Sequence, residues 1–407
     1  MPRSTINGTA IDLDGKEMIL DADQDTTLTV DTDDQIDIKV AGSDKLKIDA
    51  SSHLVTHTAG TSNLVLGVNA GNSIASGGNY NVALGDEAGT SLTTGLNNTI
   101  VGALAGDALT DADQNVAIGT SALGADTQGS QSTAVGSGAL QFQNFTSSTI
   151  SYNTAVGYEA GNDITTAQYN TLVGYQAGDA IDTGGTNTAL GVHAGGALTS
   201  GSGNIMIGIE VGVNTVAVDT GVNNILIGYQ ARASATNASQ QIVLGRQVTS
   251  AGNNNFTFGD GGTDSNIAFG ATSISAPSDQ RYKEEIETAT AGLSFINDLR
   301  PVTFKWKKQK DIPPEHDSYV ESSNTRVMNS LGETHHGFIA QEVKTAIDNH
   351  SELKDGFDMW SIDERDKTDG RQRLAEGALI PILTKALQEL SAKNDALEAR
   401  IKKLEGS

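Results

Sequence analysis

The chain has 407 residues and no cysteine, which excludes disulfide frameworks and thiolate metal sites. Aromatic residues make up 5% of the chain and glycine accounts for 46 residues, so we expect narrow packing dominated by backbone contacts. Residues 1–277 hold 7 Lys and Arg against 26 Asp and Glu, a net charge of −19, whereas residues 278–407 hold 19 against 24, a net charge of −5. Such an acidic surface repels phosphate groups, so we expect no nucleic-acid partner.

The sequence also lacks the apolar segments that membranes and export require. No apolar run approaches the length of a membrane span, and the first fifteen residues contain no apolar core of the signal-peptide kind. We therefore expect no membrane insertion, and folding in a cytoplasm.

Residues 1–60 alternate apolar and polar side chains. The alternation is clearest at Leu28–Val30, Ile36–Val40 and Leu46–Ile48, between clusters of Gly and Asp. A period of two bounded in this way predicts short, half-buried strands. We interpret residues 1–60 as a separate β-rich segment, which would serve for attachment to a larger assembly or form a triple β-helix.

The acidic run Asp21–Asp25 resembles part of a calcium loop. Thr26 stands where the sharp turn of an EF-hand needs glycine, and Thr32 stands where the bidentate Glu should be. An EF-hand is therefore excluded and a looser calcium site is left open. We assign no metal ligands and no cofactor to the chain.

From residue 61 to residue 277 the motif Asn-x-apolar-apolar-Gly recurs. Most of its glycines are 17 residues apart, and they stand at positions 67, 85, 102, 119, 136, 157, 174, 191, 208, 228, 245, 259 and 270. An Asn lies four residues before nearly every one, with Ser132 and Gln241 as the two exceptions. A fixed period this short is typical of a solenoid whose coils stack on one another.

Each residue type in the motif suits a stacked coil. Glycine permits a positive φ at a corner, Asn can bond backbone groups or the Asn of the next coil, and alanine keeps the interior narrow. The repeats resemble the Asn-Ser-Val-Ala-Ile-Gly coils in the heads of trimeric autotransporter adhesins, and also repeats of phage tail fibres. That resemblance implies left-handed parallel β-rolls joined in threes.

Three tyrosines directly follow repeat glycines, at Tyr158, Tyr175 and Tyr229. A row of this kind either packs against neighbouring coils or forms a receptor-contact strip. A polysaccharide depolymerase would need paired carboxylates in a groove. The 14 acidic residues between 61 and 277 show no convergent position of that kind, so catalysis in the shaft is the less favoured interpretation.

Beyond Ser278 the sequence changes character. We expect a helix over 291–299, a strand over 300–307 and a second helix from about 337 onward. From residue 380 to residue 404 a heptad pattern predicts a coiled coil, with seam positions Ile380, Leu383, Leu387, Leu390, Asn394, Leu397, Ile401 and Leu404. The polar Asn394 in that seam would set the register and the number of chains.

Four blocks of this region, SDQRYKEEI, LSFINDLRPVTFKWK, GFIAQEV and LIPILTKALQELSAKNDALEARIKKLE, resemble the intramolecular chaperone of phage endosialidases, tailspikes and fibres. The resemblance covers residues 278–407. It implies a trimerising α+β domain that nucleates folding of the upstream fibre and then cuts itself off as a serine peptidase.

The family pattern Ser-Asp-x-Arg-x-Lys falls on Ser278–Lys283. The resemblance makes Ser278 the nucleophile and Lys283 its base, with cleavage between Pro277 and Ser278. A lysine acts as a base only when neutral, so its pKa of about 10.4 must fall by several units through burial or a neighbouring cation. Asp279 and Arg281 would organise the site. A helix start capped by Ser278 is the alternative interpretation.

The sequence thus predicts a mainly β homotrimer, with a parallel β-solenoid shaft over 61–277 and an α+β chaperone ending in a trimeric coiled coil. We interpret it as a virion protein, a phage tail fibre or receptor-binding adhesin, assembled in the host cytoplasm. Its partners would be a cell-surface glycan receptor and a tail or baseplate protein. A bacterial trimeric surface adhesin and a tailspike depolymerase are the alternatives. A self-cleaving membrane-bound transcription factor is disfavoured, because the chain lacks a membrane span and a basic surface.

Overall fold

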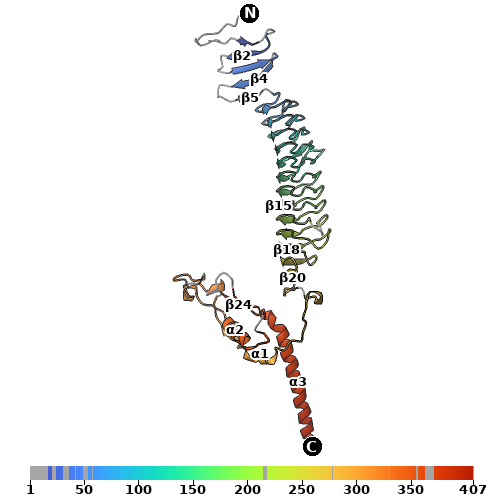
Figure 1. Cartoon of the computed structure of the whole chain (residues 1–407). Coiled ribbons are helices and arrows are strands. Elements are labelled where there is room, and N and C mark those ends of the chain that lie inside the picture. The colour runs from blue at the N-terminus through green and yellow to red at the C-terminus, as the bar shows by residue number, and fades with distance from the viewer. Residues whose placement is uncertain are drawn as a thin grey trace. The chain divides into compact units, whose positions relative to one another are not determined.

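The structure is a computed structural model, and it describes residues 17–20, 24–30, 36–41, 43–48, 54–56, 58–213, 218–276, 278–314, 316, 318–329, 331–353, 356–362 and 371–406. The chain forms two compact units, Met1–Ser278 and Asp279–Ser407. Figure 1 shows the elements of each unit along the chain.

The first unit begins with a five-stranded antiparallel meander. Its strands, each paired with the next, are β1 (Glu17–Ile19), β2 (Thr27–Val30), β3 (Ile36–Val40), β4 (Ser43–Ile48) and β5 (Leu54–Thr56). The alternating pattern of the sequence therefore predicted β2, β3 and β4 correctly. Asp21, Ala22 and Asp23 of the acidic run lie outside the described residues.

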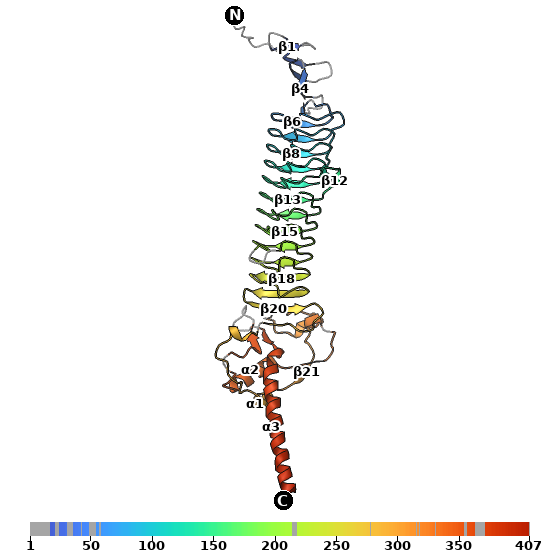
Figure 2. The ribbon, with the colours of Figure 1, turned by 90° about the vertical axis from the view of Figure 1, so that its right-hand side faces the viewer.

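The repeats form a β-solenoid in which each copy contributes a short strand (Figure 2), of three residues as far as β17 and of six residues from β18 onward. Its thirteen-stranded sheet is parallel except for its last pair, and β10 and β12 form a small parallel pair beside it. The strands are β6 (Leu64–Leu66), β7 (Val82–Leu84), β8 (Thr99–Val101), β9 (Val116–Ile118), β10 (Gly129–Ser130), β11 (Thr133–Val135), β12 (Thr149–Ile150), β13 (Thr154–Val156), β14 (Thr171–Val173), β15 (Thr188–Leu190), β16 (Ile205–Ile207), β17 (Ile225–Ile227), β18 (Gln241–Arg246), β19 (Asn255–Asp260) and β20 (Thr263–Ala268).

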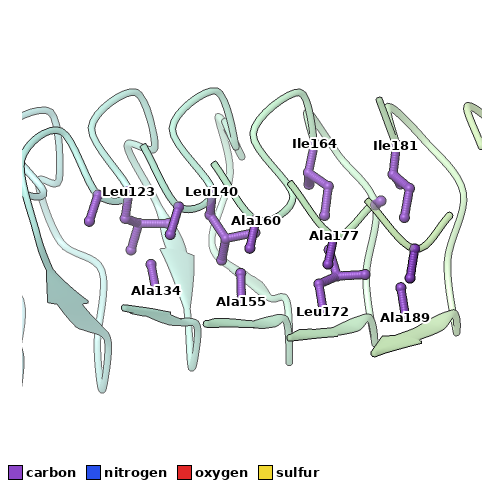
Figure 3. Packing of buried hydrophobic residues seen from close by; sticks show 14 of the residues in the cluster. Leu123, Ala134, Leu140, Ala155, Ala160, Ile164, Leu172, Ala177, Ile181 and Ala189 are labelled. Atoms are coloured by element: carbon purple, nitrogen blue, oxygen red, sulfur yellow. The ribbon is translucent and has the colours of Figure 1, made fainter. Parts of the chain in front are cut away.

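The core of the solenoid is a column of small and aliphatic side chains. The middle residue of each short strand points inward and lies in register with the next, as Ala155, Leu172 and Ala189 do. Ile164 and Ile181 fill the opposite wall (Figure 3). Because a coil buries so few side chains of its own, each coil depends on its two neighbours for a core.

The repeat glycines stack directly on one another. At Gly174 φ is 139°, a region that L-residues rarely adopt, and an added Cβ would lie 2.3 Å from the carbonyl oxygen of Gly191 in the next coil. The predicted role of the repeat glycine at a positive-φ corner is confirmed. The structure adds a second reason, because the backbones of successive coils approach too closely there for any side chain.

The asparagines of the motif form a buried ladder. The backbone N–H of Asn187 donates to Oδ1 of Asn170 (2.9 Å), and Nδ2 of Asn170 donates to the carbonyl of Gly184 (3.0 Å). Equivalent bonds join Asn81, Asn98 and Asn115. Each Asn thus satisfies a backbone donor of one coil and a backbone acceptor of another, which keeps the narrow interior free of unpaired backbone groups.

Where Ser132 replaces Asn, Gln143 of the same copy completes the ladder. Nε2 of Gln143 donates to Oγ of Ser132 (2.8 Å), and Oε1 of Gln143 accepts from Nδ2 of Asn153 (2.8 Å). Gln143 also donates to the fully buried Asp126, whose other oxygen accepts two backbone N–H groups. Burial raises the pKa of Asp126, and these hydrogen bonds oppose that rise.

Asp126 and Gln143 stand seven residues after the repeat glycine, where the other coils from Gly67 to Gly191 have Leu or Ile. In those two coils Leu123 and Leu140 occupy the position four after the glycine, which is otherwise glycine from 71 to 212. Both leucines are buried with φ near 50°, so they restore the apolar volume at the cost of a strained backbone. The two changes compensate each other.

The last repeat is not a coil. β20 turns back and pairs antiparallel with β19, so the prediction that Gly270 closes a further copy is wrong. The spacing between Gly259 and Gly270 is 11 residues, compared with 17 in most copies. Eleven residues are enough for a hairpin but not for a full coil of the solenoid. Asn255 and Asn266 accordingly lie outside the buried ladder.

In the part of the second unit that the structure describes, the chain forms three helices and two short hairpins. The helices are α1 (Leu293–Asp298), α2 (Ala340–Asn349) and α3 (Leu379–Glu405). The hairpins pair β21 (Val302–Phe304) with β22 (His335–Gly337) and β23 (Trp360–Ile362) with β24 (Gln372–Leu374). The 3-10 turns are η1 (Gln280–Tyr282), η2 (Gln309–Asp311), η3 (Val327–Asn329) and η4 (Glu376–Ala378). Phe295 and Met359 are fully buried in their common core.

Helix α3 has two apolar faces, and its own chain covers one of them. Leu379, Ile382 and Ala386 are buried in the core of the second unit. The predicted heptad leucines and isoleucines lie on another face and are 47–68% exposed.

The predictions of a mainly β fold, of a solenoid and of a long terminal helix are confirmed. Among the helices in the described part of the chain, none is long and apolar enough to cross a membrane.

Candidate functional site

The candidate cleavage segment follows directly on the shaft. The backbones of Asn266 and Ser275 pair by two hydrogen bonds of 2.8 and 2.7 Å, and Ala276 is the last described residue before Ser278. Pro277, whose carbonyl is predicted to belong to the scissile bond, lies outside the described residues. Ser278 closes the first unit, and the second unit begins with Asp279.

A short 3-10 turn, η1, separates Ser278 from Lys283. Asp279 caps it, because its Oδ1 accepts the backbone N–H of Arg281 (2.9 Å), and the backbone N–H of Lys283 donates to the carbonyl of Gln280 (3.1 Å). The cap of this turn is thus Asp279, whereas the alternative interpretation of the sequence gave that role to Ser278.

Asp279 and Arg281 also form an ion pair across the turn. Nη2 of Arg281 lies 2.6 Å from Oδ2 of Asp279, and Nε contacts both carboxylate oxygens. Hydrogen bonds from Arg281 lower the pKa of Asp279, and the same contacts raise the pKa of Arg281. The pair holds the turn between the two predicted catalytic residues, and Ser278 and Lys283 themselves are both exposed.

Two further charged contacts tie the helices of the second unit together. Nε and Nη2 of Arg300 donate to the two carboxylate oxygens of Glu342, at 3.0 and 2.5 Å. His350, nearly buried at the end of α2, lies between Oδ2 of Asp298 (2.9 Å) and Oε1 of Glu352 (3.0 Å), and its ring packs against the edge of Phe295. The sequence analysis missed this His350 cluster, because Asp298 lies 52 positions before His350 and no local motif marks the three residues.

We expect the second unit to lose stability as the pH rises above neutrality. The hydrogen bond to Asp298, and to a smaller extent the one to Glu352, raises the pKa of His350. A histidine whose pKa is raised by folding contributes its full stabilisation of the folded state when the pH is below the pKa of the unfolded chain, about 6.5. That contribution is lost as the pH rises through the pKa of the folded state. We expect a loss on the order of 1 kcal/mol, the difference between a charged and a neutral hydrogen bond.

Tryptophan fluorescence can measure this loss in the whole chain, since Trp306 and Trp360 both belong to the second unit. Urea unfolding at pH 6 and at pH 8.5 should show the difference. A His350→Gln chain should be less stable at pH 6 and show little change between the two values. An equal pH dependence in both chains would contradict the assignment.

The predicted tyrosine strip is exposed on the shaft. The rings of Tyr158 and Tyr175 are stacked, with centroids 5.5 Å apart and planes within 10°. Val192 and Ile209 occupy the equivalent positions of the next two coils and separate the pair from Tyr229. Each ring covers one face of the other, and Tyr158 and Tyr175 remain 48% and 50% exposed.

Asn394, predicted to set the coiled-coil register, lies on the exposed face of α3. Its Nδ2 donates to Oε1 of Glu398 one turn later (3.1 Å). Within the described ranges, no three or more His, Cys, Asp or Glu side chains come together as a metal site would require.

Comparisons with known proteins bear on the second unit alone. Searches of the curated proteins and of the solved structures found no match to the chain. One family model does match, over residues 278–352, and the start of the matched segment is Ser278 itself. The model describes the chaperone of endosialidase, a family of self-cleaving serine peptidases. The segment that follows the β-solenoid is therefore similar to that chaperone.

Proposed function

We propose that the chain is a homotrimeric phage tail fibre or receptor-binding adhesin with a self-removing intramolecular chaperone. The observation that carries the proposal is the family match beginning at Ser278, directly after a solenoid of stacked coils. The second unit would align three chains, nucleate folding of the shaft, and then release itself by cleavage between Pro277 and Ser278. The product would be a virion protein bound to a tail or baseplate and, at the cell surface, to a glycan.

The exposed heptad face of α3 supports assembly. Its apolar seam is separate from the face that Leu379, Ile382 and Ala386 bury within the chain. Exposed seams of this length are covered in coiled coils by further copies of the same helix, and an Asn at one seam position selects the register. Three copies in parallel would cover the seam and place Asn394 next to its two counterparts.

The outer face of the solenoid sheet also supports assembly. The residues on either side of each inward-pointing side chain face outward and are largely aliphatic: Leu66, Ile118, Val156, Leu190, Ile205 and Leu244 are 37–50% exposed. An apolar sheet face that runs the length of a shaft is larger than monomeric proteins usually leave in water. Packing of three shafts through this face would bury it.

The cleavage chemistry follows from the residue types. The amine of Lys283 would take the proton of the Ser278 hydroxyl, whose Oγ attacks the carbonyl carbon of Pro277. The C–N bond then breaks, the proton passes to the leaving amine of Ser278, and an ester joins Pro277 to Oγ. Water hydrolyses the ester, which leaves a carboxylate at Pro277 and a free amino terminus at Ser278.

This chemistry couples cleavage to assembly. Lys283 can act as a base only as the neutral amine, which burial favours, and its side chain is exposed in the single chain. We therefore expect the trimer to bury Lys283 and so to complete the site. Removing the chaperone afterwards would leave the shaft held kinetically, since parallel β-coils re-form slowly without an aligned start.

The tyrosine strip is the proposed receptor contact of the shaft. One ring face of Tyr158 and one of Tyr175 are covered by each other, and the hydroxyl groups of both remain for the contact. Such a surface could hydrogen-bond a glycan.

Expression of the wild-type chain and of Ser278→Ala tests the proposal. Wild type should yield a fragment with the mass of residues 278–407 by mass spectrometry, and Ser278→Ala should remain a 407-residue chain. Light scattering of the uncut chain should give three times the chain mass of 42.2 kDa. Lys283→Met should also block cleavage.

Ser273→Ala, at a similarly exposed serine of the same segment, is the matched control and should be cut normally. A wild-type chain that stays intact as a trimer would remove the peptidase part of the proposal. An uncut monomer would remove both parts.

A further inference from the structure

We propose that a basic, aromatic-floored groove in the second unit binds an acidic, extended segment of the fibre chain itself, namely residues 20–37 before they fold. This inference rests on the proposed chaperone function and names the segment that the chaperone would hold. Nothing in the family match specifies such a site.

The groove is a cavity of about 1140 Å³ between the two hairpins and the loop after β21. Among the described residues that line it, five are basic and one is acidic: Lys305, Lys307, Arg326, Arg371, Arg373 and Glu376. The chain as a whole carries −24, so this concentration of positive charge runs against its composition. A basic cleft in an acidic protein attracts acidic ligands and focuses the field on them.

Several of the cations are held in place by the groove itself. Nη1 of Arg326 donates to the carbonyl of Trp306 (2.5 Å), and Nη2 of Arg371 donates to Oγ of Ser318 (2.9 Å). Lys305 and Lys307 are exposed and alternate with half-buried neighbours along the segment that follows β21. Within the part of the chain that the structure describes, neither lysine has a carboxylate partner.

The floor of the groove is apolar. Phe304 and Trp306 meet edge to face with centroids 5.2 Å apart, and Phe338 also lines the cavity. A ligand that fits both features must carry negative charges on one side and apolar groups on the other. An extended peptide has this form when acidic and apolar residues alternate, because successive side chains point to opposite sides.

Residues 20–37 have that composition. They include seven Asp and no Lys, Arg or Glu, interleaved with Leu20, Ala22, Leu28, Val30 and Ile36. In the folded chain, part of this segment forms β2 and the start of β3 of the amino-terminal meander, so the segment is available to another partner only before folding. Holding it in the groove would keep an acidic, edge-forming segment from pairing wrongly while the three chains align.

Fluorescence titration of a full-length Ser278→Ala, Trp360→Phe chain tests the inference, because Trp306 in the groove is then its only tryptophan. A synthetic peptide of residues 20–37 should change Trp306 emission saturably. Affinity should fall about tenfold or more when the salt concentration is raised from about 50 to about 500 mM. The same peptide with its seven Asp replaced by Asn should bind at least about tenfold more weakly, since the ion pairs supply the attraction.

Charge reversal localises the site. Lys305→Glu with Lys307→Glu should abolish the titration, whereas Lys402→Glu with Lys403→Glu, at exposed positions in the last turn of α3, should leave it unchanged. Equal binding of the Asn peptide, or unchanged binding after reversal of Lys305 and Lys307, would overturn the inference. Single-stranded DNA that binds as tightly as the acidic peptide would also overturn it, by showing a general polyanion surface.

The outcomes separate this inference from the proposed function. Normal cleavage and trimer mass with no peptide binding would reject the groove alone. Peptide binding to a chain that neither trimerises nor cuts itself would reject the proposed function and leave an acidic-peptide site.

Discussion

Replacing Gly174 with valine is expected to prevent regular stacking of the coils on either side of it. The backbone φ of 139° is strained for any L-residue, and the new Cβ would lie 2.3 Å from the carbonyl oxygen of Gly191, which is itself fixed by the next coil. Neither atom is the flexible end of a side chain, so one coil must move as a whole. We expect a loss of more than about 4 kcal/mol, or failure to reach the folded shaft.

Circular dichroism during denaturant unfolding measures this effect, together with the yield of soluble protein. Gly174→Ala is the milder variant that keeps the comparison informative if the valine chain does not fold. Gly262→Ala is the matched control, because that glycine has nothing within 4 Å of its would-be Cβ and no positive φ. A Gly174→Val chain as stable as the Gly262→Ala chain would show that the coils do not stack as described.

The second large effect is expected at the asparagine ladder. Asn170→Ala removes the acceptor of the Asn187 N–H and the donor to the Gly184 carbonyl, and both backbone groups are then buried without a partner. Each unpaired buried group costs about 1–3 kcal/mol, so the expected loss is roughly 2–5 kcal/mol. The loss should appear as a lower denaturant midpoint, with Asn144→Ala at an exposed position of the same shaft as the control.

Asn170→Asp separates the two bonds. An ionised carboxylate still accepts from the Asn187 N–H, but it faces the Gly184 carbonyl with a buried negative charge. Once protonated, it can donate to that carbonyl as the amide does. The Asp variant should therefore be unstable at pH 7 and recover part of its stability near pH 4. An Asp variant without pH dependence would contradict the proposed geometry of the ladder.

Much of the fold follows from short-range patterns. The repeat predicted stacked coils because its glycine and asparagine each perform a backbone task that recurs in every coil. The heptad predicted α3, and the alternation in residues 1–60 predicted β2 to β4. Each of these elements is stabilised by contacts whose spacing along the chain is constant, so a single sequence displays them.

Contacts between distant residues were not predictable in this way. Gln143 completes the ladder at Ser132 from 11 residues later in the same copy, and Leu123 and Leu140 fill the volume that Asp126 and Gln143 leave. A reader of the sequence sees only two irregular repeats there. The hairpin of β19 and β20 was likewise taken for a further coil, because the motif persists while the spacing that permits a coil has been lost.

At the candidate site, the motif Ser278–Lys283 and its boundary position were visible in the sequence, and the family match begins at the same serine. The pairing of Asp279 with Arg281 across η1 required the structure, as did the His350 cluster and the basic groove. The positions of ionised side chains depend on which elements pack together, and periodicity carries no such information.

Repeats, charge and heptads are properties of residue order, so they identify a long acidic repeat joined to a different, heptad-ended domain without any structure. Which faces remain uncovered follows from the tertiary packing. It buried one stripe of α3 and left the heptad seam open, and it turned one side of every solenoid strand outward. The physical reason is that a side chain becomes core or surface through what packs against it.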